Sequence, residues 1–159
     1  ENDQFDYSFC QINADLTDKN SLRFALGVGS PENIVKLFFM GYQFFDCVLP
    51  TRDARHQRLY VFKVDPQTLD QNELKKLALA NRLDEIFDYL YIGKGIFATD
   101  KTAISTFCDC PICQNAAIAP PVSKAYLHHL FKIGDASAFR LASLHNLRTY
   151  TQTMEILRR

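Results

Sequence analysis

Two short apolar segments on either side of a helix-forming stretch constrain the fold more than any other feature of the sequence. Residues 22–28 (LRFALGV) and 44–49 (FFDCVL) are predicted strands, apolar on both faces. Between them, Ser30 can cap a helix, Pro31 suits its first position, and ENIVKLFFM has helical apolar spacing up to Gly41. Two such strands around one helix predict a parallel βαβ unit and therefore an α/β fold.

The carboxyl ends of parallel strands lie at one edge of a sheet or barrel, where such folds place their chemistry. We therefore expect Gly27, Val28, Gly29 and Asp46 to converge at one edge. Asp46 stands between apolar residues, so we expect it to be desolvated and either satisfied by local hydrogen bonds or used in chemistry. Pro50 is expected to end this segment in a turn.

Length and charge narrow the protein class. The chain has 159 residues, 47% of them hydrophobic, and a formal net charge of zero. This is sufficient for one globular core and argues against a generic polyanion binder. Basic residues gather in segments 51–63 and 124–159, which either face phosphates or form solvated helix faces. The polar start ENDQFDYSF and the lack of a long apolar run predict neither a secretory signal nor a membrane span.

Further elements follow from local signals. Residues 59–64 (LYVFKV) are a predicted strand, and residues 70–90 are a predicted helix that Asp70 begins. Helices are also expected from Ser123 to Gly134 and from Asp135 to about residue 157, with a loop over residues 115–122.

Three of the five cysteines lie within six residues, in a C-x-C-x-x-C pattern. An odd cysteine number and this clustering favour a reducing compartment and metal ligation over disulfides. Structural zinc requires four ligands in a tetrahedron, so a histidine is needed, unless the cluster consists of reduced, partly buried thiols. The residues alone do not choose among the histidines. The cysteines are Cys108, Cys110 and Cys113, and the candidate histidines are His56, His128, His129 and His145.

Three blocks taken together resemble the tRNA-guanine transglycosylases, also called queuine tRNA-ribosyltransferases. They are GVGSPENIV, FFDCVLPTRDAR, and CDCPICQ followed by SKAYLHHLFKIGD and LHNLRTY. The resemblance implies the C-terminal portion of a (β/α)8 TIM barrel with an inserted zinc-binding subdomain and C-terminal helices. Residues 1–107 would hold the last barrel βα units with an extended helical insertion, and residues 108–159 the zinc-binding subdomain. It also implies a cytoplasmic enzyme, a pentosyltransferase acting on tRNA.

The family's reaction exchanges guanine at the tRNA wobble position for a 7-deazaguanine base, through a covalent aspartyl-ribose intermediate. The resemblance implies Asp46 as the nucleophile, and a closed, structural Zn2+ held by the three cysteines and His145. Positions that match the family's contacts to the base or the tRNA anticodon loop are Leu26, Gly27, Thr51, Arg52 and Arg55. Leu26 stands where many bacterial members carry methionine, a volume-conserving difference.

The chain also departs from the family pattern. His56 and Gln57 replace an Asn-Gly turn, and the stretches before and after the cysteine cluster are longer than usual. The family's Asp-Ser-Gly-Gly and Gly-Gly-Leu-Ala-Val-Gly-Glu segments, which supply the general base and base recognition, have no counterpart here. A complete barrel needs roughly 250 residues. We therefore expect a partial chain that depends on a longer polypeptide, a homodimer, or a partner chain supplying the N-terminal barrel half.

Two other functions stay open. One is a non-catalytic, zinc-containing partner subunit of the same fold, although retention of Asp46, Arg52 and Arg55 argues against it. The other is a small zinc-stabilised helical module that binds RNA or protein without chemistry.

Overall fold

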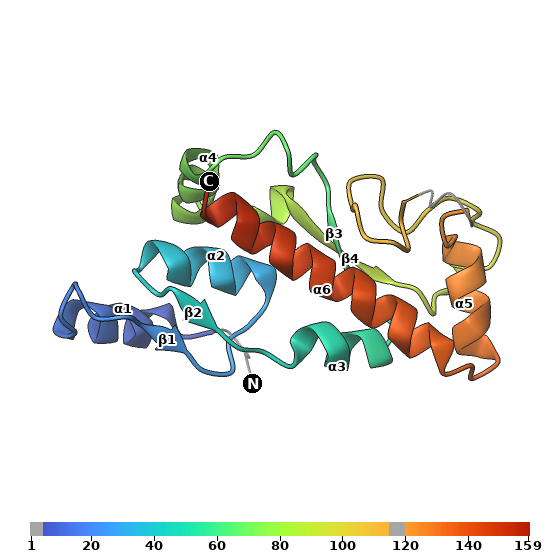
Figure 1. The fold of residues 1–159 in the computed structure, drawn as a ribbon, viewed down its shortest axis with the longest axis horizontal. Helices are drawn as coiled ribbons and strands as arrows, with labels where there is room; N and C mark the ends of the chain where they lie inside the picture. The colour runs from blue at the N-terminus through green and yellow to red at the C-terminus, as the bar shows by residue number, and fades with distance from the viewer. Residues whose placement is uncertain (1–4, 115–119) are drawn as a thin grey trace.

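The computed structural model describes residues 5–114 and 120–159 and combines helices with two small sheets (Figure 1). This mixture agrees with the expected α/β class. The α-helices are α1 (Tyr7–Leu16), α2 (Pro31–Phe39), α3 (Leu49–Arg55), α4 (Gln71–Leu79), α5 (Lys124–Lys132) and α6 (Ser137–Leu157). The strands are β1 (Phe24–Ala25), β2 (Phe44–Phe45), β3 (Arg58–Phe62) and β4 (Phe87–Tyr91), and the 3-10 helices are η1 (Leu83–Glu85) and η2 (Gly95–Phe97).

The predicted βαβ unit is confirmed. Strands β1 and β2 pair in parallel, with Phe24 opposite Phe44, and α2 connects them. The hydroxyl of Ser30 accepts a hydrogen bond from the backbone N–H of Asn33, and Pro31 occupies the first turn of α2. Both local signals in the sequence therefore act as expected.

The prediction of a turn at Pro50 is wrong, because this segment forms helix α3. Pro50 lies in the first turn of this helix. A proline is tolerated there, since its missing N–H has no intrahelical partner in any case and its fixed φ suits a helix. The helix continues to Arg55 and then turns directly into β3.

The helix predicted for residues 70–90 is correct only in its first half. Asp70 caps α4 through a 2.8 Å hydrogen bond from the N–H of Glu73, and the helix ends before Asn81, which has a φ of 54°. The remainder contains η1 and strand β4, which pairs antiparallel with β3. Cross-strand contacts such as Phe62 beside Phe87 override the helical pattern there.

The two C-terminal helices agree with the sequence. Ser123 caps α5 by accepting from the N–H of Tyr126, and Gly134 follows the helix with a φ of 72°. Asp135 accepts a 2.8 Å hydrogen bond from the N–H of Ser137, where α6 begins. Of the loop expected at 115–122, residues 115–119 lie outside the described residues.

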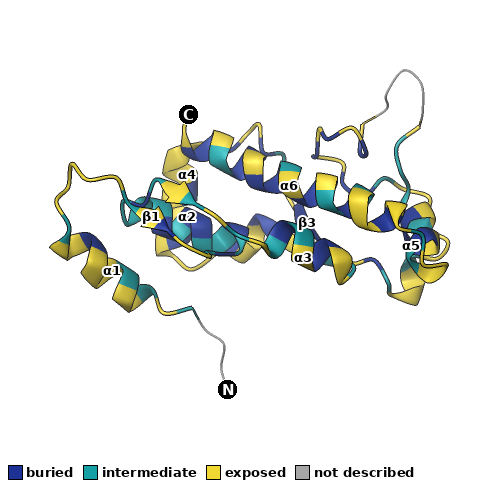
Figure 2. Cartoon of the chain, turned by 60° about the horizontal axis from the view of Figure 1, so that its bottom comes forward, coloured by how far each residue is buried: buried dark blue, intermediate teal, exposed yellow. Residues whose placement is uncertain are grey.

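Helix α6 is the central element, with α2 and α3 on one side and the β3–β4 sheet on the other (Figure 1). Helix α6 has many buried residues along its length (Figure 2). Most residues of α1, by contrast, are exposed. Among the described residues, no helix combines the length and apolar character needed to cross a membrane. The expected division at residue 107 stays a prediction.

Candidate active-site edge and metal centre

Asp46 lies at the carboxyl end of β2 and is hydrogen-bonded to the segment that follows β1. The backbone N–H of Gly27 donates to Asp46 Oδ1 at 2.7 Å. The expected convergence at one strand edge is therefore observed for these two residues. The expected desolvation is not, because Asp46 is exposed. The reason is that β2 pairs only with β1 within the described chain, so its far edge is open.

The segment after β1 is held in place beside Asp46. The hydroxyl of Tyr150, on α6, donates to the carbonyl of Gly29 at 3.0 Å, and the Cys47 thiol donates to the same oxygen at 3.4 Å. Leu26, expected to line the base pocket, is 73% exposed. A largely apolar cavity of about 490 Å3 lies between β2 and α6, and its lining includes Asp46, Phe44, Phe45, Leu147, Tyr150 and Met154.

The positions matched to tRNA contacts lie on α3, which begins three residues after Asp46. The Thr51 hydroxyl donates to the carbonyl of Val48 at 3.2 Å. Arg52 and Arg55 are both exposed, and Arg52 Nε lies 3.6 Å from Asp53 Oδ1. The fold therefore presents two guanidinium groups to solvent on the helix that follows the candidate nucleophile.

The inner face of α3 is fixed to the β3–β4 sheet through a buried carboxylate. Asp53 accepts a hydrogen bond from the hydroxyl of Tyr60 and lies 3.4 Å from an Arg58 guanidinium nitrogen. That guanidinium stacks 4.1 Å above the ring of Tyr89, whose hydroxyl donates to Glu32 on α2. Burial raises the pKa of Tyr60 and of Tyr89, so both hydroxyls stay protonated donors at neutral pH.

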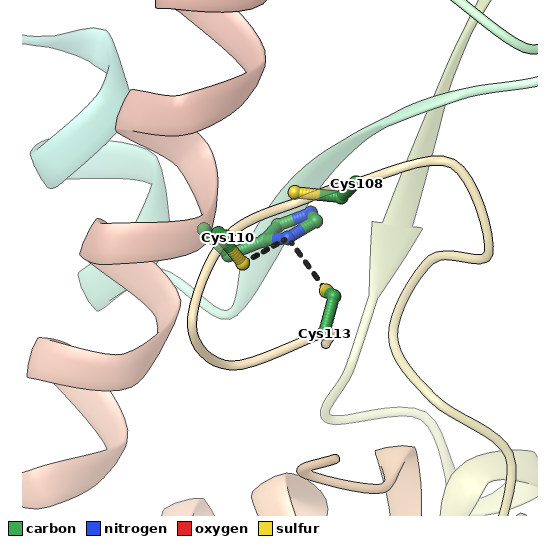
Figure 3. Close-up of side chains that lie close together, drawn as sticks. Cys108, Cys110 and Cys113 are labelled. Atoms are coloured by element: carbon green, nitrogen blue, oxygen red, sulfur yellow. Dashed lines mark hydrogen bonds between the residues drawn. The ribbon is translucent and has the colours of Figure 1, made fainter. Parts of the chain in front are cut away.

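The three clustered cysteines and one histidine form a second site on the other side of the fold. Their ligand atoms lie within 4.8 Å of one another, and all four residues are buried. Figure 3 shows the three thiols turned toward one another around an imidazole ring. His145 Nδ1 lies 3.3 Å from Cys113 Sγ and 3.8 Å from Cys110 Sγ. Ligand atoms around tetrahedral zinc are separated by roughly 3.5–3.8 Å, so the donor set fits this ion.

A backbone carbonyl determines which nitrogen of His145 faces the thiols. His145 Nε2 lies 2.8 Å from the carbonyl oxygen of Tyr60, which can only accept a hydrogen bond. Nε2 therefore carries a proton and Nδ1 faces the thiols, so Nδ1 is the nitrogen that would bind a metal ion. Two of the alternative histidines are elsewhere: His128 bonds the carbonyl of Ile92 at 2.7 Å, and His129 is exposed.

The comparison with protein families decides where this chain belongs. The model of the queuine tRNA-ribosyltransferase family matches residues 3–159. The chain is a member of this family. A queuine tRNA-ribosyltransferase from Helicobacter hepaticus (strain ATCC 51449 / 3B1) is 33% identical over 148 residues, 93% of this chain. Those from Helicobacter pylori (strain P12) and Helicobacter acinonychis (strain Sheeba) are each 34% identical over 142 residues, 89% of this chain.

The chain spans only about a third of the curated relatives it matches, namely 31% of the Helicobacter hepaticus protein and 30% of the two others. Within this length, the structure brings together two groups of residues that the family pattern led us to expect. These are the Asp46 edge and the group of Cys108, Cys110, Cys113 and His145.

Hydrogen bonds among the clustered thiols of this family member favour the thiolate form of Cys110. Hydrogen bonds from Cys108 and then Cys113 lower the pKa of Cys110, with a smaller contribution from His145. The thiolate is the form of cysteine that binds metal. The centre therefore offers a deprotonated sulfur that is shielded from water and lies beside the buried imidazole of His145.

Sequence reasoning missed two residues that support these sites. Arg148 makes a bidentate contact with Asp109, the residue between the first two cysteines, and also binds Glu155. Asn146, next to His145, is completely buried and bonds the backbone of α3. Asn146 lies within the LHNLRTY block, but no residue pattern there distinguishes its role from that of its neighbours.

Proposed function

We propose that this chain is the C-terminal part of an enzyme that exchanges guanine at the tRNA wobble position for a 7-deazaguanine base. In this role Asp46 is the nucleophile. Its carboxylate attacks C1′ of the ribose, the C1′–N9 bond to guanine breaks, and the RNA is held as an aspartyl ester until the incoming base displaces the carboxylate. The proton needed by the departing guanine comes from outside this chain.

The observation that carries the proposal is the hydrogen bond between Gly27 and Asp46. One carboxylate oxygen is anchored at 2.7 Å while the group as a whole stays exposed. A fixed, accessible carboxylate at the shared end of two parallel strands suits attack on an extruded nucleotide. The neighbouring Arg52 and Arg55 suit phosphates and unstacked bases of the anticodon loop, because a planar guanidinium both pairs with phosphate and stacks.

The exposed face of the β1–β2 sheet supports the proposal that the unit belongs to a TIM barrel. Large apolar side chains are exposed at alternate positions along β1 and its extensions, and at Phe44 on β2. Phe24 is 52% exposed and Phe44, its pairing partner, 48%, while Ala25 on the opposite face is buried. Leu22 and Leu26, which alternate with Phe24 along the chain, are exposed as well. The remaining barrel strands would cover this face, supplied by a longer polypeptide or a partner chain, including a second copy in a homodimer.

The donor set supports zinc as the resident metal, with a structural role. Zinc would be held by Cys108, Cys110, Cys113 and His145, and four protein ligands leave no open position for a reacting water. When bound, it would tie the segment around Cys110 onto α6, and the chemistry would stay with Asp46. Five unpaired thiols are compatible with the reducing cytoplasm, which we propose as the location.

The test is covalent trapping of tRNA by the full-length protein carrying Asp46→Asn. We expect the trapped complex and the exchange of labelled guanine to be lost, with zinc content unchanged. Asp88→Asn is the matched control, because Asp88 is an exposed strand carboxylate that also accepts a backbone hydrogen bond, at 2.8 Å. Normal trapping by Asp46→Asn would exclude Asp46 as the nucleophile. A wild-type protein that binds tRNA without exchanging guanine would instead indicate an accessory subunit.

A further inference from the structure

Asn146 connects the metal centre to the helix that follows the candidate nucleophile. It is 0% exposed and follows the metal-site residue His145 in α6. Its Nδ2 donates to the carbonyl of Pro50 at 2.9 Å and to that of Arg58 at 3.0 Å, and its Oδ1 accepts from the N–H of Tyr60 at 3.0 Å. One side chain thus bonds the backbone at the start of α3 and at two positions of β3.

The neighbouring residues of α6 hold the same part of β3. The carbonyl of Tyr60 accepts from His145 Nε2 at 2.8 Å and from the Thr149 hydroxyl at 3.1 Å. Because the other nitrogen of His145 faces the thiols, a bound metal ion would hold the imidazole from one side while Tyr60 holds it from the other. A continuous series of short contacts therefore runs from the metal centre through α6 to Pro50.

Helix α3 depends on such external contacts. It has seven residues, and its N-cap residue, Val48, provides no side-chain hydrogen bond. Helices this short are unstable in isolation, so tertiary contacts must determine whether α3 forms and where it lies. The contact from Asn146 to Pro50 lies in its first turn, close to Asp46.

We infer that Asn146 is a positioning residue through which occupancy of the metal centre orders α3. The consequence for tRNA rests on the function proposed above, because α3 carries Thr51, Arg52 and Arg55. The ordering itself does not rest on that function. The metal centre, although remote from the strand edge in sequence, controls the orientation of the helix that borders this edge.

The experiment is hydrogen–deuterium exchange of the full-length, zinc-loaded protein before and after removal of zinc with a chelator. Residues 49–55 of α3 report the coupling, and residues 31–39 of α2 report general unfolding. In the wild type, we expect zinc removal to accelerate exchange in α3 by about tenfold or more, the change that follows loss of one buried hydrogen-bond partner. We expect α2 to change much less. Equal acceleration in both helices, or none in α3, would overturn the inference.

Asn146→Asp tests the connection directly, since it keeps the shape but replaces two N–H donors with an oxygen that faces two carbonyl oxygens. We expect one zinc ion per chain, rapid exchange in α3 with zinc bound, and little further change on chelation. Thr153→Val is the matched control, because Thr153 is buried in α6 and, among the residues that the structure describes, its hydroxyl bonds only within this helix, at 2.8 Å to the carbonyl of Thr149. Slow exchange in α3 of the zinc-loaded Asn146→Asp variant would contradict the inference.

If Asn146→Asp does not fold, Asn146→Ser removes the same contacts without adding charge, and the wild-type chelation result stands independently. Kinetics then separate this inference from the proposed function. A raised KM for tRNA with a smaller change in kcat is expected for Asn146→Ser if α3 contacts RNA. The wild type could also show faster hydrogen–deuterium exchange in α3 on zinc removal while failing to incorporate labelled guanine. This result would refute the proposed function and leave the coupling intact.

Discussion

The backbone N–H of Gly27 donates a hydrogen bond to the carboxylate of Asp46 at 2.7 Å, joining the ends of two neighbouring parallel strands. This contact fixes the orientation of the candidate nucleophile without burying it. Gly27 adopts a φ of 70°, a left-handed conformation that favours glycine, although the space around its Cβ position is empty. A side chain at Gly27 is therefore opposed by backbone strain and not by crowding.

Gly27→Ala should accordingly lower both stability and guanine exchange. The left-handed conformation costs a residue with a Cβ roughly 1–2 kcal/mol, and relief of this strain would move the N–H away from Asp46. Thermal unfolding and labelled-guanine exchange of the full-length protein measure the two effects. Gly95→Ala is the control, because Gly95 is exposed, has equally open surroundings and does not adopt a positive φ. Unchanged activity in Gly27→Ala would show that this N–H does not orient the carboxylate.

Cys110→Ala should abolish metal binding. Cys110 is 1% exposed and its thiol faces the other three ligands, so its loss leaves three donors for an ion that requires four. Zinc per chain, measured by atomic emission, should fall from about one toward zero, with a lower melting temperature. Cys10→Ala, at a cysteine on α1 outside the cluster, should retain the metal. Full zinc content in Cys110→Ala would place the metal elsewhere.

Asp109→Asn should make zinc easier to remove. Arg148 binds Asp109 in a bidentate manner and holds the segment between Cys108 and Cys110 against α6. An ion pair in this partly exposed position contributes at most about 1 kcal/mol, so the apparent zinc affinity should fall by no more than about fivefold. Competition with a zinc chelator measures the change. Arg140→Ala, which removes an exposed charge on α6, should leave the zinc affinity unchanged. An equal loss of zinc affinity in both variants would argue against a specific contact between Arg148 and Asp109.

Arg55→Ala should weaken tRNA binding more than it weakens chemistry. Arg55 is exposed at the end of α3, on the helix that follows Asp46. Loss of one phosphate contact should raise KM for tRNA and reduce the slope of log affinity against log salt by about 0.7–1. Binding titrations at several salt concentrations give this slope. Lys75→Ala, which removes an exposed charge on α4, serves as the control. If log affinity against log salt had the same slope for Arg55→Ala as for the wild type, a phosphate contact by Arg55 would be excluded.

Alkaline pH should destabilise the protein through its buried and half-buried tyrosines. Burial raises the pKa of Tyr7 to about 12 and raises the pKa values of Tyr60, Tyr89 and Tyr150 from the ordinary value of 10. A raised pKa in the folded state means that the unfolded chain releases its protons first. The stabilisation is therefore complete below pH 10 and is lost as the pH rises through 10 toward the folded-state values.

Urea unfolding from pH 8 to about 11 measures this loss. Tyr89→Phe should unfold more easily at neutral pH, by about 1 kcal/mol, because the hydrogen bond to Glu32 is absent. Its decline above pH 10 should be shallower than that of the wild type, since one titrating group has been removed. Tyr126→Phe, at a tyrosine that is 51% exposed, should follow the wild-type curve, and an identical curve for Tyr89→Phe would contradict the assignment.

Elements whose signals are local could be predicted from the residues alone. Ser30 and Ser123 cap the helices predicted from them, and the alternation of apolar strand, helix and apolar strand predicted the parallel unit. The cysteine pattern predicted a metal ligand set, since its three thiols lie within six residues. Caps and turns are local because they satisfy backbone groups with side chains a few positions away.

Features that depend on distant partners could not be predicted in this way, because tertiary contacts set them. Residues 87–91 form a strand because β3 lies beside them, although their sequence continues a helical pattern. The residues alone left four histidines open and the family resemblance implied His145; the fold brings His145 to the thiols, with its Nε2 2.8 Å from the carbonyl of Tyr60, 85 positions earlier. The roles of Asn146 and Arg148 likewise come from contacts 96 and 39 positions away. Such contacts leave no periodic trace in the sequence, because their energy is realised only after the chain has folded.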